Sequence, residues 1–459
     1  MRLTSPVAAV FSLLLVAAPV AAAEPDLAAK ITPLAQAVID EEDAVGIVVG
    51  VVKAGQAHVW AFGETKRGGG EKPNDRTVYE IGSVSKAITG TLLADMVERK
   101  LVRLDDPAQR YLPDGVTMPV ADDKPITLEH LATHTSGLPR LPSNMKPADA
   151  RNPYADYTID RMYDFLNSHK LRRPPGEHEY SNYAVGLLGQ LLARKAGGDY
   201  ESLLAERITK PLAMNDTRVA LTDDMRRRLA PPYDASLDPD ANWDLPALAG
   251  AGGIRSTAAD MLKLIQAALA ADDTPQRRAL RRSFEKRMDL KNGQAMGLNW
   301  FIARDGVTRW HTGMTGGYSS WLSIVPKSGI GVVVLSNTAT ARTAELGEQV
   351  TQAAFGLEVK PRPGRKPVKV DPKILARYVG EYRLGLFFWL TVTMENDRLM
   401  VRATNQPKVP VFAESPTKFF YKVVDAQITF VADDKGDVEK LILHQNGADH
   451  EARRELPKK

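Results

Sequence analysis

The sequence GSVSK occupies residues 82–86, directly after a strand-like run at 77–81 and at the start of a helical pattern that extends to residue 100. Residues three positions apart share one face of a helix, so the amine of Lys86 can reach the hydroxyl of Ser83. A serine hydroxyl is a weak nucleophile at neutral pH and needs a base beside it. The free backbone N–H groups at a helix start also favour a developing negative charge. This stretch therefore predicts a nucleophilic serine with a lysine base.

Ser-x-x-Lys is a weak signal by itself, because it occurs four times in the 459 residues. The other copies begin at Ser143 in a proline-bounded loop, at Ser283 in the middle of a basic helix, and at Ser415 before a proline. Only the copy at Ser83 stands at a junction between a strand and a helix. Context therefore favours Ser83 as the nucleophile and Lys86 as its base.

Tyr180-Ser181-Asn182 is a second candidate motif, which the turn at 174–176 (Pro-Pro-Gly) places at a helix start. The Tyr180 phenol can move a proton between Ser83 and a leaving group if the nearby lysine charge lowers its pKa. The side-chain amide of Asn182 can orient a substrate amide. We therefore predict that Tyr180 is catalytic and that Asn182 binds substrate.

A third candidate motif, His311-Thr312-Gly313, lies in a strand-like stretch. The Thr312 hydroxyl can hydrogen-bond a substrate carboxylate, and the glycine lets a substrate backbone approach closely. The backbone N–H of Met314, together with that of Ser83, would form an oxyanion hole. We expect His311, Thr312, Gly313 and Met314 to bind substrate.

Hydrophobic patterning around these motifs predicts an α+β fold. Apolar residues at helical spacing occur at 28–40. A β-branched run at 46–53, a turn at 54–56 and a second run at 58–62 predict a hairpin. Helical patterns cut by proline-rich loops fill most of 127–290, and strand patterns return at 298–337. We expect one antiparallel sheet built from both ends of this region, with flanking helices and an inserted helical subdomain.

The N-terminus has the layout of a secretory signal peptide, with Arg2, an apolar run at 7–16 and three alanines at 21–23. A membrane anchor is the alternative, but a span needs roughly 20 apolar residues. We expect cleavage, export to the periplasm or the exterior, and no stable membrane span afterwards. The predicted domains are the signal peptide at 1–23, a serine hydrolase domain at 24–359, a Pro- and Lys-rich linker at 360–372 and a C-terminal antiparallel β domain at 373–459.

Composition excludes several classes of protein. The chain has no cysteine, which rules out disulfides, thiol nucleophiles and cysteine-ligated zinc. The net charge of +4 is too small to indicate a nucleic-acid partner, and the basic stretch at 277–287 reads as a solvated helix face, with contact to an anionic polymer as the alternative. His130 and His134 share a helix face but lack the glutamate of a zinc-peptidase motif. We expect no metal and no cofactor.

Taken in order, the three motifs resemble the class C β-lactamase and DD-peptidase family of penicillin-recognising serine hydrolases. The resemblance covers about residues 30–345 and includes further matching stretches at 101–113, 126–139, 211–217 and 252–261. It implies a β-lactamase/transpeptidase-like fold, an acyl-enzyme mechanism and the residue roles given above. The C-terminal unit resembles an appended lipocalin-like β domain, on the stretches 378–382 (YVGEY) and 423–430 (VVDAQITF).

His311 departs from the commonest pattern of the family, because class C β-lactamases usually carry lysine there. Some DD-carboxypeptidases carry His-Thr-Gly with Tyr-Ser-Asn, so we expect a peptidase of the D-Ala-D-Ala carboxypeptidase type, with a peptidoglycan-type peptide or a β-lactam as partner. The alternatives are a class C-like β-lactamase, a carboxylic-ester hydrolase and a β-lactam sensor without turnover. The histidine also suggests that carboxylate binding weakens as His311 loses its proton, at about pH 6.5 if its pKa is unperturbed, with Arg342 as an alternative source of fixed charge.

Overall fold

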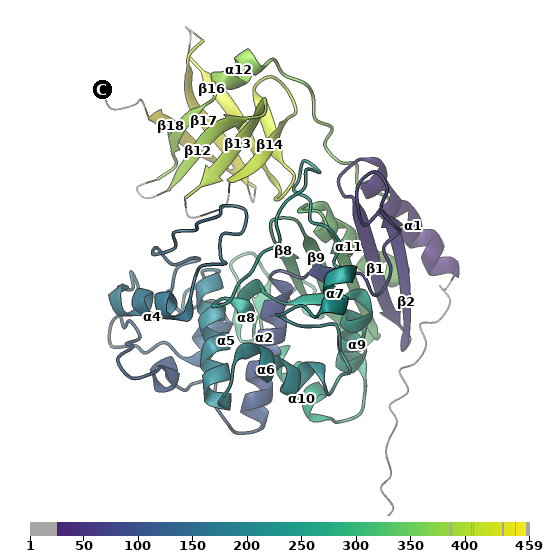
Figure 1. Cartoon of the computed structure of the whole chain (residues 1–459), viewed down its shortest axis with the longest axis vertical. Coiled ribbons are helices and arrows are strands. Elements are labelled where there is room, and N and C mark those ends of the chain that lie inside the picture. The colour runs from purple at the N-terminus through teal and green to yellow at the C-terminus, as the bar shows by residue number, and fades with distance from the viewer. Residues whose placement is uncertain are drawn as a thin grey trace, which may run out of the picture.

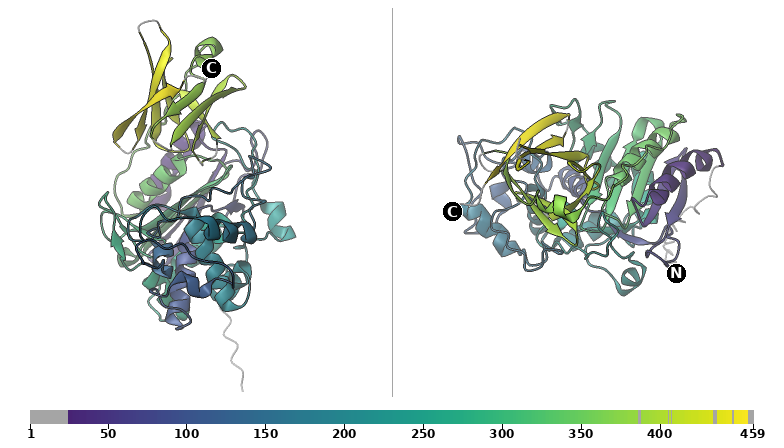
Figure 2. Two further views of the ribbon diagram at one scale, coloured as in Figure 1. Left: turned by 90° about the vertical axis from the view of Figure 1, so that its left-hand side faces the viewer. Right: turned by 90° about the horizontal axis from the view of Figure 1, so that it is seen from above.

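The computed structural model describes residues 25–455 except 386, 387, 405, 407, 434, 435 and 446. The predicted signal peptide at 1–23 lies outside the described residues. Figure 1 shows a larger α+β unit with a smaller β barrel above it, and Figure 2 shows that the barrel stands at one end of the larger unit. The predicted α+β class with an additional antiparallel β domain is confirmed.

An eight-stranded antiparallel sheet forms the centre of the larger unit. Its strands, in spatial order, are β2 (Gln56–Gly63), β1 (Gly46–Lys53), β10 (Ile330–Ser336), β9 (Ser319–Val325), β8 (Arg309–Met314), β7 (Phe301–Ile302), β6 (Ala295–Met296) and β5 (Met288–Asp289). The pairing of β1 with β10 sets Val49 opposite Val334. The two ends of the region therefore close one sheet, as predicted.

Side chains of this sheet alternate between two helical layers, because successive residues of a strand point to opposite faces. Val49 and Val334 pack with α1 (Pro25–Asp40) and α11 (Arg342–Ala354) on one face. Val48 and Val333 pack with α9 (Ala258–Leu269) on the other face, where α2 (Val84–Glu98) also contacts the sheet. Burial on both faces explains why β1 is a continuous apolar run.

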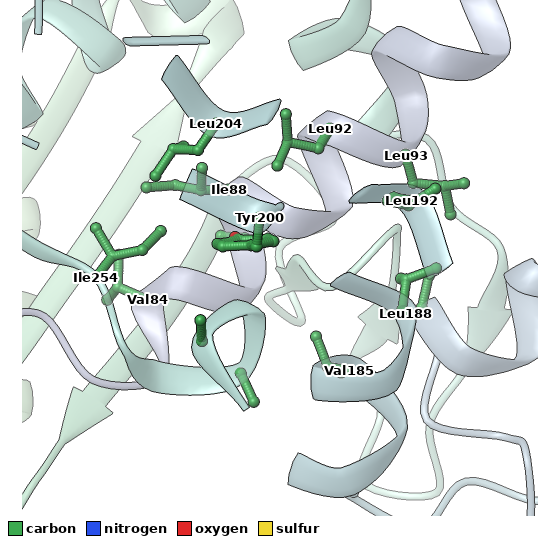
Figure 3. Close-up of a cluster of buried hydrophobic side chains, with 14 of the residues drawn as sticks. Val84, Ile88, Leu92, Leu93, Val185, Leu188, Leu192, Tyr200, Leu204 and Ile254 are labelled. Carbon is green, nitrogen blue, oxygen red and sulfur yellow. The ribbon is translucent and has the colours of Figure 1, made fainter. Parts of the chain in front are cut away.

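Helix α2 begins directly after Ser83 and runs through the middle of the inserted helical subdomain. All residues from 84 to 96 are buried, so the helix is enclosed on every side and not only along one apolar face. Figure 3 shows Ile88 of α2 in a cluster with Leu188 of α5 (Asn182–Ala196) and Leu204 of α6 (Tyr200–Leu204). This core fixes the helix that carries the candidate nucleophile.

The other helices between the two halves of the sheet are short, as the proline-rich patterning suggests. They are η1 (Ala108–Tyr111), α3 (Leu128–Ala132), α4 (Ile159–Ser168), η2 (Ala205–Thr209), α7 (Asp223–Arg228), α8 (Ala249–Gly252) and α10 (Pro275–Ser283), and η3 (Pro326–Ser328) follows β9. Within the described part of the chain, no helix has the length and apolar character needed to cross a membrane.

The basic stretch at 277–287 lies on α10 and in the turn after it. Acidic side chains beside it form ion pairs: Asp272 with Arg277, Asp273 with Arg278 and Arg281, and Glu98 with Arg278 and Arg282. These pairs neutralise much of the charge and disfavour contact with an anionic polymer. Ser283 is the last residue of α10, where the sequence suggested the middle of a helix.

An extended segment after α11 leads to α12 (Pro372–Ala376) and then to a closed barrel of eight antiparallel strands. The strands are β11 (Gly380–Arg383), β12 (Trp389–Glu395), β13 (Arg398–Ala403), β14 (Lys408–Ala413), β15 (Lys418–Tyr421), β16 (Ala426–Ala432), β17 (Val438–Gln445) and β18 (Ala448–Glu455). Tyr378, Tyr382 and Phe430 pack together in its core. The barrel therefore has a hydrophobic core of its own.

The barrel is attached to the larger unit by polar contacts. The Lys422 ammonium lies 2.7 Å from the Asp43 carboxylate, and both side chains are at most 10% exposed. The backbone N–H of Ala341 donates a hydrogen bond of 2.7 Å to the carbonyl oxygen of Lys422. Arg398 forms a second, more exposed ion pair with Asp238 at 3.2 Å.

Candidate active site

Ser83 is the N-cap of α2 and follows a short strand pair formed by β3 (Val78–Glu80) and β4 (Arg255–Thr257). Gly82 before it has a φ of 50°, a left-handed conformation that favours glycine. A Cβ atom at position 82 would also lie 2.6 Å from the backbone nitrogen of Met314. The turn that presents Ser83 is therefore packed against the end of β8, and Met314 lies beside it as the oxyanion-hole prediction requires.

Gly313 has a different reason to be glycine from the one expected. A Cβ atom there would overlap the carbonyl oxygen of Ile81 and the hydroxyl of Ser320. Ser320, opposite Gly313 in β9, donates a hydrogen bond of 2.8 Å to the same Ile81 oxygen. The space beside Gly313 is therefore occupied by the backbone of Ile81. The glycine lets β8 pack closely against the turn at residues 81–83 that presents Ser83.

Lys86 is fully buried and lies next to the candidate nucleophile. Its Nζ donates hydrogen bonds to the Ser83 Oγ at 2.8 Å and to the carbonyl oxygen of Ala251 at 2.6 Å. Burial lowers the Lys86 pKa well below 10.5, and the positive charge of Arg140 lowers it further. A lysine whose pKa is lowered in this way gives up its proton more readily than an exposed lysine and can act as a base.

Tyr180 lies beside Lys86, whose Nζ is 5.0 Å from the centroid of the Tyr180 ring. Burial raises the Tyr180 pKa to about 12, and contact with Ser83 and the charge of Arg140 offset only part of this rise. The expectation that the lysine charge lowers the pKa of this phenol is therefore wrong, because desolvation dominates. Tyr180 is a neutral phenol, suited to donate a proton.

The His134 ring packs against the Tyr180 ring, a contact that its sequence context did not reveal. The two rings are 4.4 Å apart, and the His134 Nδ1 accepts a hydrogen bond of 3.1 Å from the backbone N–H of Ser181. The His130 Nδ1 accepts a hydrogen bond of 3.2 Å from the backbone N–H of Thr127, which caps α3. Both histidines therefore make local structural contacts, and they do not act together as a pair.

Asn182 is the first residue of α5, and Ser181 caps this helix by accepting a hydrogen bond from the backbone N–H of Ala184. The Asn182 side-chain oxygen is buried but has no hydrogen-bond partner in the described part of the chain. The residue lines a small pocket together with Tyr154, Trp243, Leu245 and Met314, among others. An unpaired amide oxygen in a pocket is available to a ligand.

His311 lies on β8 with Thr312 beside it and is 2% exposed. The Nδ1 is 2.6 Å from the carbonyl oxygen of Thr312, which can only accept, so Nδ1 carries the hydrogen and Nε2 is a free acceptor. Burial, with a smaller contribution from the Lys86 charge, lowers the His311 pKa to about 3. The expected loss of a His311 charge near pH 6.5 is therefore wrong, because the ring is already neutral there.

Arg342 does not supply a charge to the site. Its guanidinium forms ion pairs with Glu41 at 3.0 Å, Asp43 at 3.2 Å and Glu345 at 2.7 Å, and its side chain is 11% exposed. A cation surrounded by three carboxylates is already neutralised. Arg140 is the basic residue that the sequence did not single out, and its guanidinium carbon lies 5.2 Å from the Tyr180 ring centroid.

The structure thus brings together all eight residues that the sequence proposed for the site, around the turn between β3 and α2 and the end of β8. Ser83 and Lys86 come from one helix, whereas Tyr180 and Asn182 start another, and residues 311–314 belong to the sheet. The arrangement contains a candidate nucleophile, a desolvated amine and a neutral phenol. It is suited to acyl transfer.

Two families match the chain. Residues 29–355 match the family described as Beta-lactamase, and residues 364–455 match a domain of unknown function, DUF3471. The D-alanyl-D-alanine-carboxypeptidase/endopeptidase AmpH of Escherichia coli (strain K12) is 31% identical over 369 residues, which are 76% of this chain and 92% of that protein. A β-lactamase of Pseudomonas fluorescens is 25% identical and covers 68% of this chain and 94% of its own length.

A solved structure is similar in the same region. The crystal structure of a β-lactamase/D-alanine carboxypeptidase from Yersinia pestis complexed with citrate superposes with a TM-score of 0.64 and 30% sequence identity. The alignment covers 72% of this chain and 98% of the Yersinia chain. By its sequence, its sheet topology and these relatives, the chain belongs to the β-lactamase family and is a serine hydrolase.

Proposed function

We propose that this serine hydrolase is an exported D-stereospecific peptidase that cleaves peptides ending in D-Ala-D-Ala through an acyl-enzyme on Ser83. The contact between the Lys86 Nζ and the Ser83 Oγ, 2.8 Å long and made by a fully buried amine, is the observation that carries the proposal. The E. coli relative that is named a D-alanyl-D-alanine-carboxypeptidase/endopeptidase supports the choice of substrate.

The reaction begins with neutral Lys86, which takes the proton of the Ser83 hydroxyl as the oxygen attacks the substrate carbonyl. The backbone N–H groups of Ser83 and Met314 stabilise the oxyanion that forms. The C–N bond then breaks, and Tyr180 donates its phenolic proton to the departing amine while Lys86 returns a proton to Tyr180. Water then hydrolyses the ester on Ser83 and restores the free enzyme.

A class C-like β-lactamase is the second candidate, because the Pseudomonas fluorescens relative is named a β-lactamase. The two activities share the acylation step and differ in how quickly water attacks the acyl-enzyme. Neutral His311 in place of lysine favours the peptidase. Export rests on the sequence pattern at 1–23, and we propose that the mature enzyme comprises 24–359, the linker at 360–372 and the β domain at 373–459.

The test is a parallel assay of residues 24–459 with a muropeptide ending in D-Ala-D-Ala, the β-lactam nitrocefin and a p-nitrophenyl ester. We expect release of D-Ala as the fastest reaction and a covalent adduct on Ser83 detectable by mass spectrometry. Rapid nitrocefin turnover without D-Ala release would favour the β-lactamase, a fast ester reaction alone would favour an esterase, and an adduct stable for hours would favour a sensor.

Ser83→Ala should abolish every one of these reactions without loss of fold. Ser143→Ala is the matched control, because Ser143 begins another Ser-x-x-Lys sequence and is exposed in a loop. Retained turnover in Ser83→Ala, with the fold intact by circular dichroism, would overturn the assignment of the nucleophile.

A further inference from the structure

Arg140 is held by its backbone beside the start of α5, which carries Asn182. Its carbonyl oxygen accepts hydrogen bonds from the backbone N–H groups of Asn182 at 3.0 Å and Tyr183 at 3.2 Å. Its side chain is exposed, and the guanidinium carbon lies 5.2 Å from the centroid of the Tyr180 ring. Contact with an aromatic face holds a guanidinium in place and leaves its N–H edge free to bind.

The Arg140 guanidinium has no carboxylate partner among the residues that the structure describes. Two other arginines of the same part of the chain do have such partners: Arg173 pairs with Glu177 at 3.2 Å and Glu179 at 2.6 Å, and Arg151 lies 4.0 Å from Asp149. The charge of Arg140 is therefore balanced only by solvent. A fixed, unpaired cation beside a candidate catalytic phenol indicates a site for an anion.

The other basic groups considered for the site cannot bind a substrate anion as well. His311 is neutral, Arg342 is occupied by three carboxylates, and Lys86 is buried with its contacts made to Ser83 and Ala251. Of these four groups, only Arg140 combines a permanent charge with an exposed side chain.

The location of Arg140 indicates which part of the substrate it meets. Its carbonyl oxygen accepts hydrogen bonds from the backbone N–H groups of Asn182 and Tyr183, and its guanidinium lies against the ring of Tyr180, two residues before Asn182. Asn182 is the residue expected to hold the amide of the acyl group. Arg140 therefore faces the acyl part of the substrate more directly than it faces Thr312.

We propose that Arg140 determines substrate specificity by pairing its guanidinium with a carboxylate that the substrate carries beside the scissile bond. The inference rests on the proposed peptidase function and adds the chemical class of substrate, an anionic peptide. A peptide can supply this carboxylate from an acidic side chain in its acyl part or from the α-carboxylate of its leaving residue. The position of Arg140 favours the acyl part.

Four peptides ending in D-Ala-D-Ala distinguish the two sources. The residue before the D-Ala pair is either glutamate or glutamine. Each of these two sequences is made with a free C-terminal carboxylate and with a C-terminal amide. We expect Arg140→Gln to lower kcat/KM about 10- to 100-fold for the glutamate peptides, as expected for a lost charge-assisted hydrogen bond. The decrease should come mainly from a higher KM. With the glutamine peptides, Arg140→Gln should have the same kcat/KM as the wild type. Arg140→Lys should restore only part of the loss, because lysine lacks the planar fork.

Arg151→Gln is the matched control, since it removes the same charge from an exposed position nearby, and it should leave all four rates unchanged. Reactions are compared on the pH plateau, because removal of Arg140 also removes a charge that lowers the Lys86 pKa. A loss that follows the C-terminal carboxylate would assign Arg140 to the leaving residue. No loss, or an equal loss for all four peptides, would overturn the inference. Failure of the wild type to cleave any of them would overturn the proposed function, and this inference with it.

Discussion

Gly313 and Ile81 lie backbone against backbone, so that a Cβ atom at position 313 would overlap the Ile81 carbonyl oxygen. This contact joins the C-terminal end of β8 to the segment that ends at Ser83. It sets the position of the Met314 backbone relative to the nucleophile, because neither segment can move toward the other. The proposed oxyanion hole would therefore be held in place by a packing contact between two segments that are far apart in the sequence.

Gly313→Ala should damage catalysis more than stability. Overpacking at a buried site typically costs about 1–3 kcal/mol, whereas a shift of about 1 Å at a catalytic centre can cost about 100-fold in rate. For Gly313→Ala we expect a loss of about 100-fold in kcat/KM, measured with the D-Ala-D-Ala peptide. The midpoint of unfolding in urea should decrease only modestly. Gly198→Ala is the control, because its Cβ would meet only the Ser202 Cβ at 3.7 Å. Full activity in Gly313→Ala would show that the contact can relax.

Lys86→Arg should abolish general-base catalysis, because arginine stays protonated at every accessible pH. We expect a loss of about 10²–10⁴-fold in kcat. In the wild type, kcat/KM should rise with pH as Lys86 loses its proton and reach its plateau well below pH 10.5, since burial lowers this pKa. Lys146→Arg, in the loop copy of Ser-x-x-Lys, should change nothing. A rate that keeps rising up to the ordinary lysine pKa would contradict the assignment of Lys86 as the base.

His311 should make the protein sensitive to acid without affecting its charge near neutral pH. Its folded pKa of about 3 lies below the ordinary value of 6.5. Between these values the unfolded chain binds a proton that the folded chain does not, so stability falls as the pH falls. The contribution is about 1.4 kcal/mol per pH unit.

Urea titrations of the wild type and His311→Asn between about pH 4 and 6 measure this contribution. We expect the variant to have the smaller pH dependence, and His450→Asn, an exposed histidine on the barrel, serves as control. Equal slopes for His311→Asn and the wild type would mean that the ring is protonated in the folded protein.

Lys422→Met should weaken the attachment of the barrel to the larger unit. The change leaves the buried Asp43 carboxylate with Arg342 as its remaining ion-pair partner. Because one partner remains, the free energy of unfolding should fall by less than the roughly 3–5 kcal/mol typical of a broken buried ion pair. Trypsin should then cut the basic linker at 360–372 faster than in the wild type. Lys440→Met is the control, because its ion pair with Glu451 lies wholly within the barrel and is more exposed. An unchanged cleavage rate would show that other contacts hold the barrel.

Local patterns in the sequence were sufficient for much of the fold and for choosing candidate site residues that the structure brings together. The spacing of Ser83 and Lys86 determines that they meet, because a helix places residues three apart on one face. The apolar run at 46–53 and the strand patterns at 298–337 predicted a single sheet correctly. The full enclosure of α2 was not predictable, because it depends on helices that pack around it from other parts of the chain.

The sequence by itself determined which residues can do the chemistry and the order in which they occur. Only the tertiary structure decided their protonation states and partners. His311 is neutral because it is buried near Lys86, and Arg342 is neutralised because Glu41, some 300 positions away, lies beside it. Arg140 remains unpaired because none of the described carboxylates folds next to it. Charge and hydration depend on neighbours in space, and neighbours that are distant in sequence leave no local pattern.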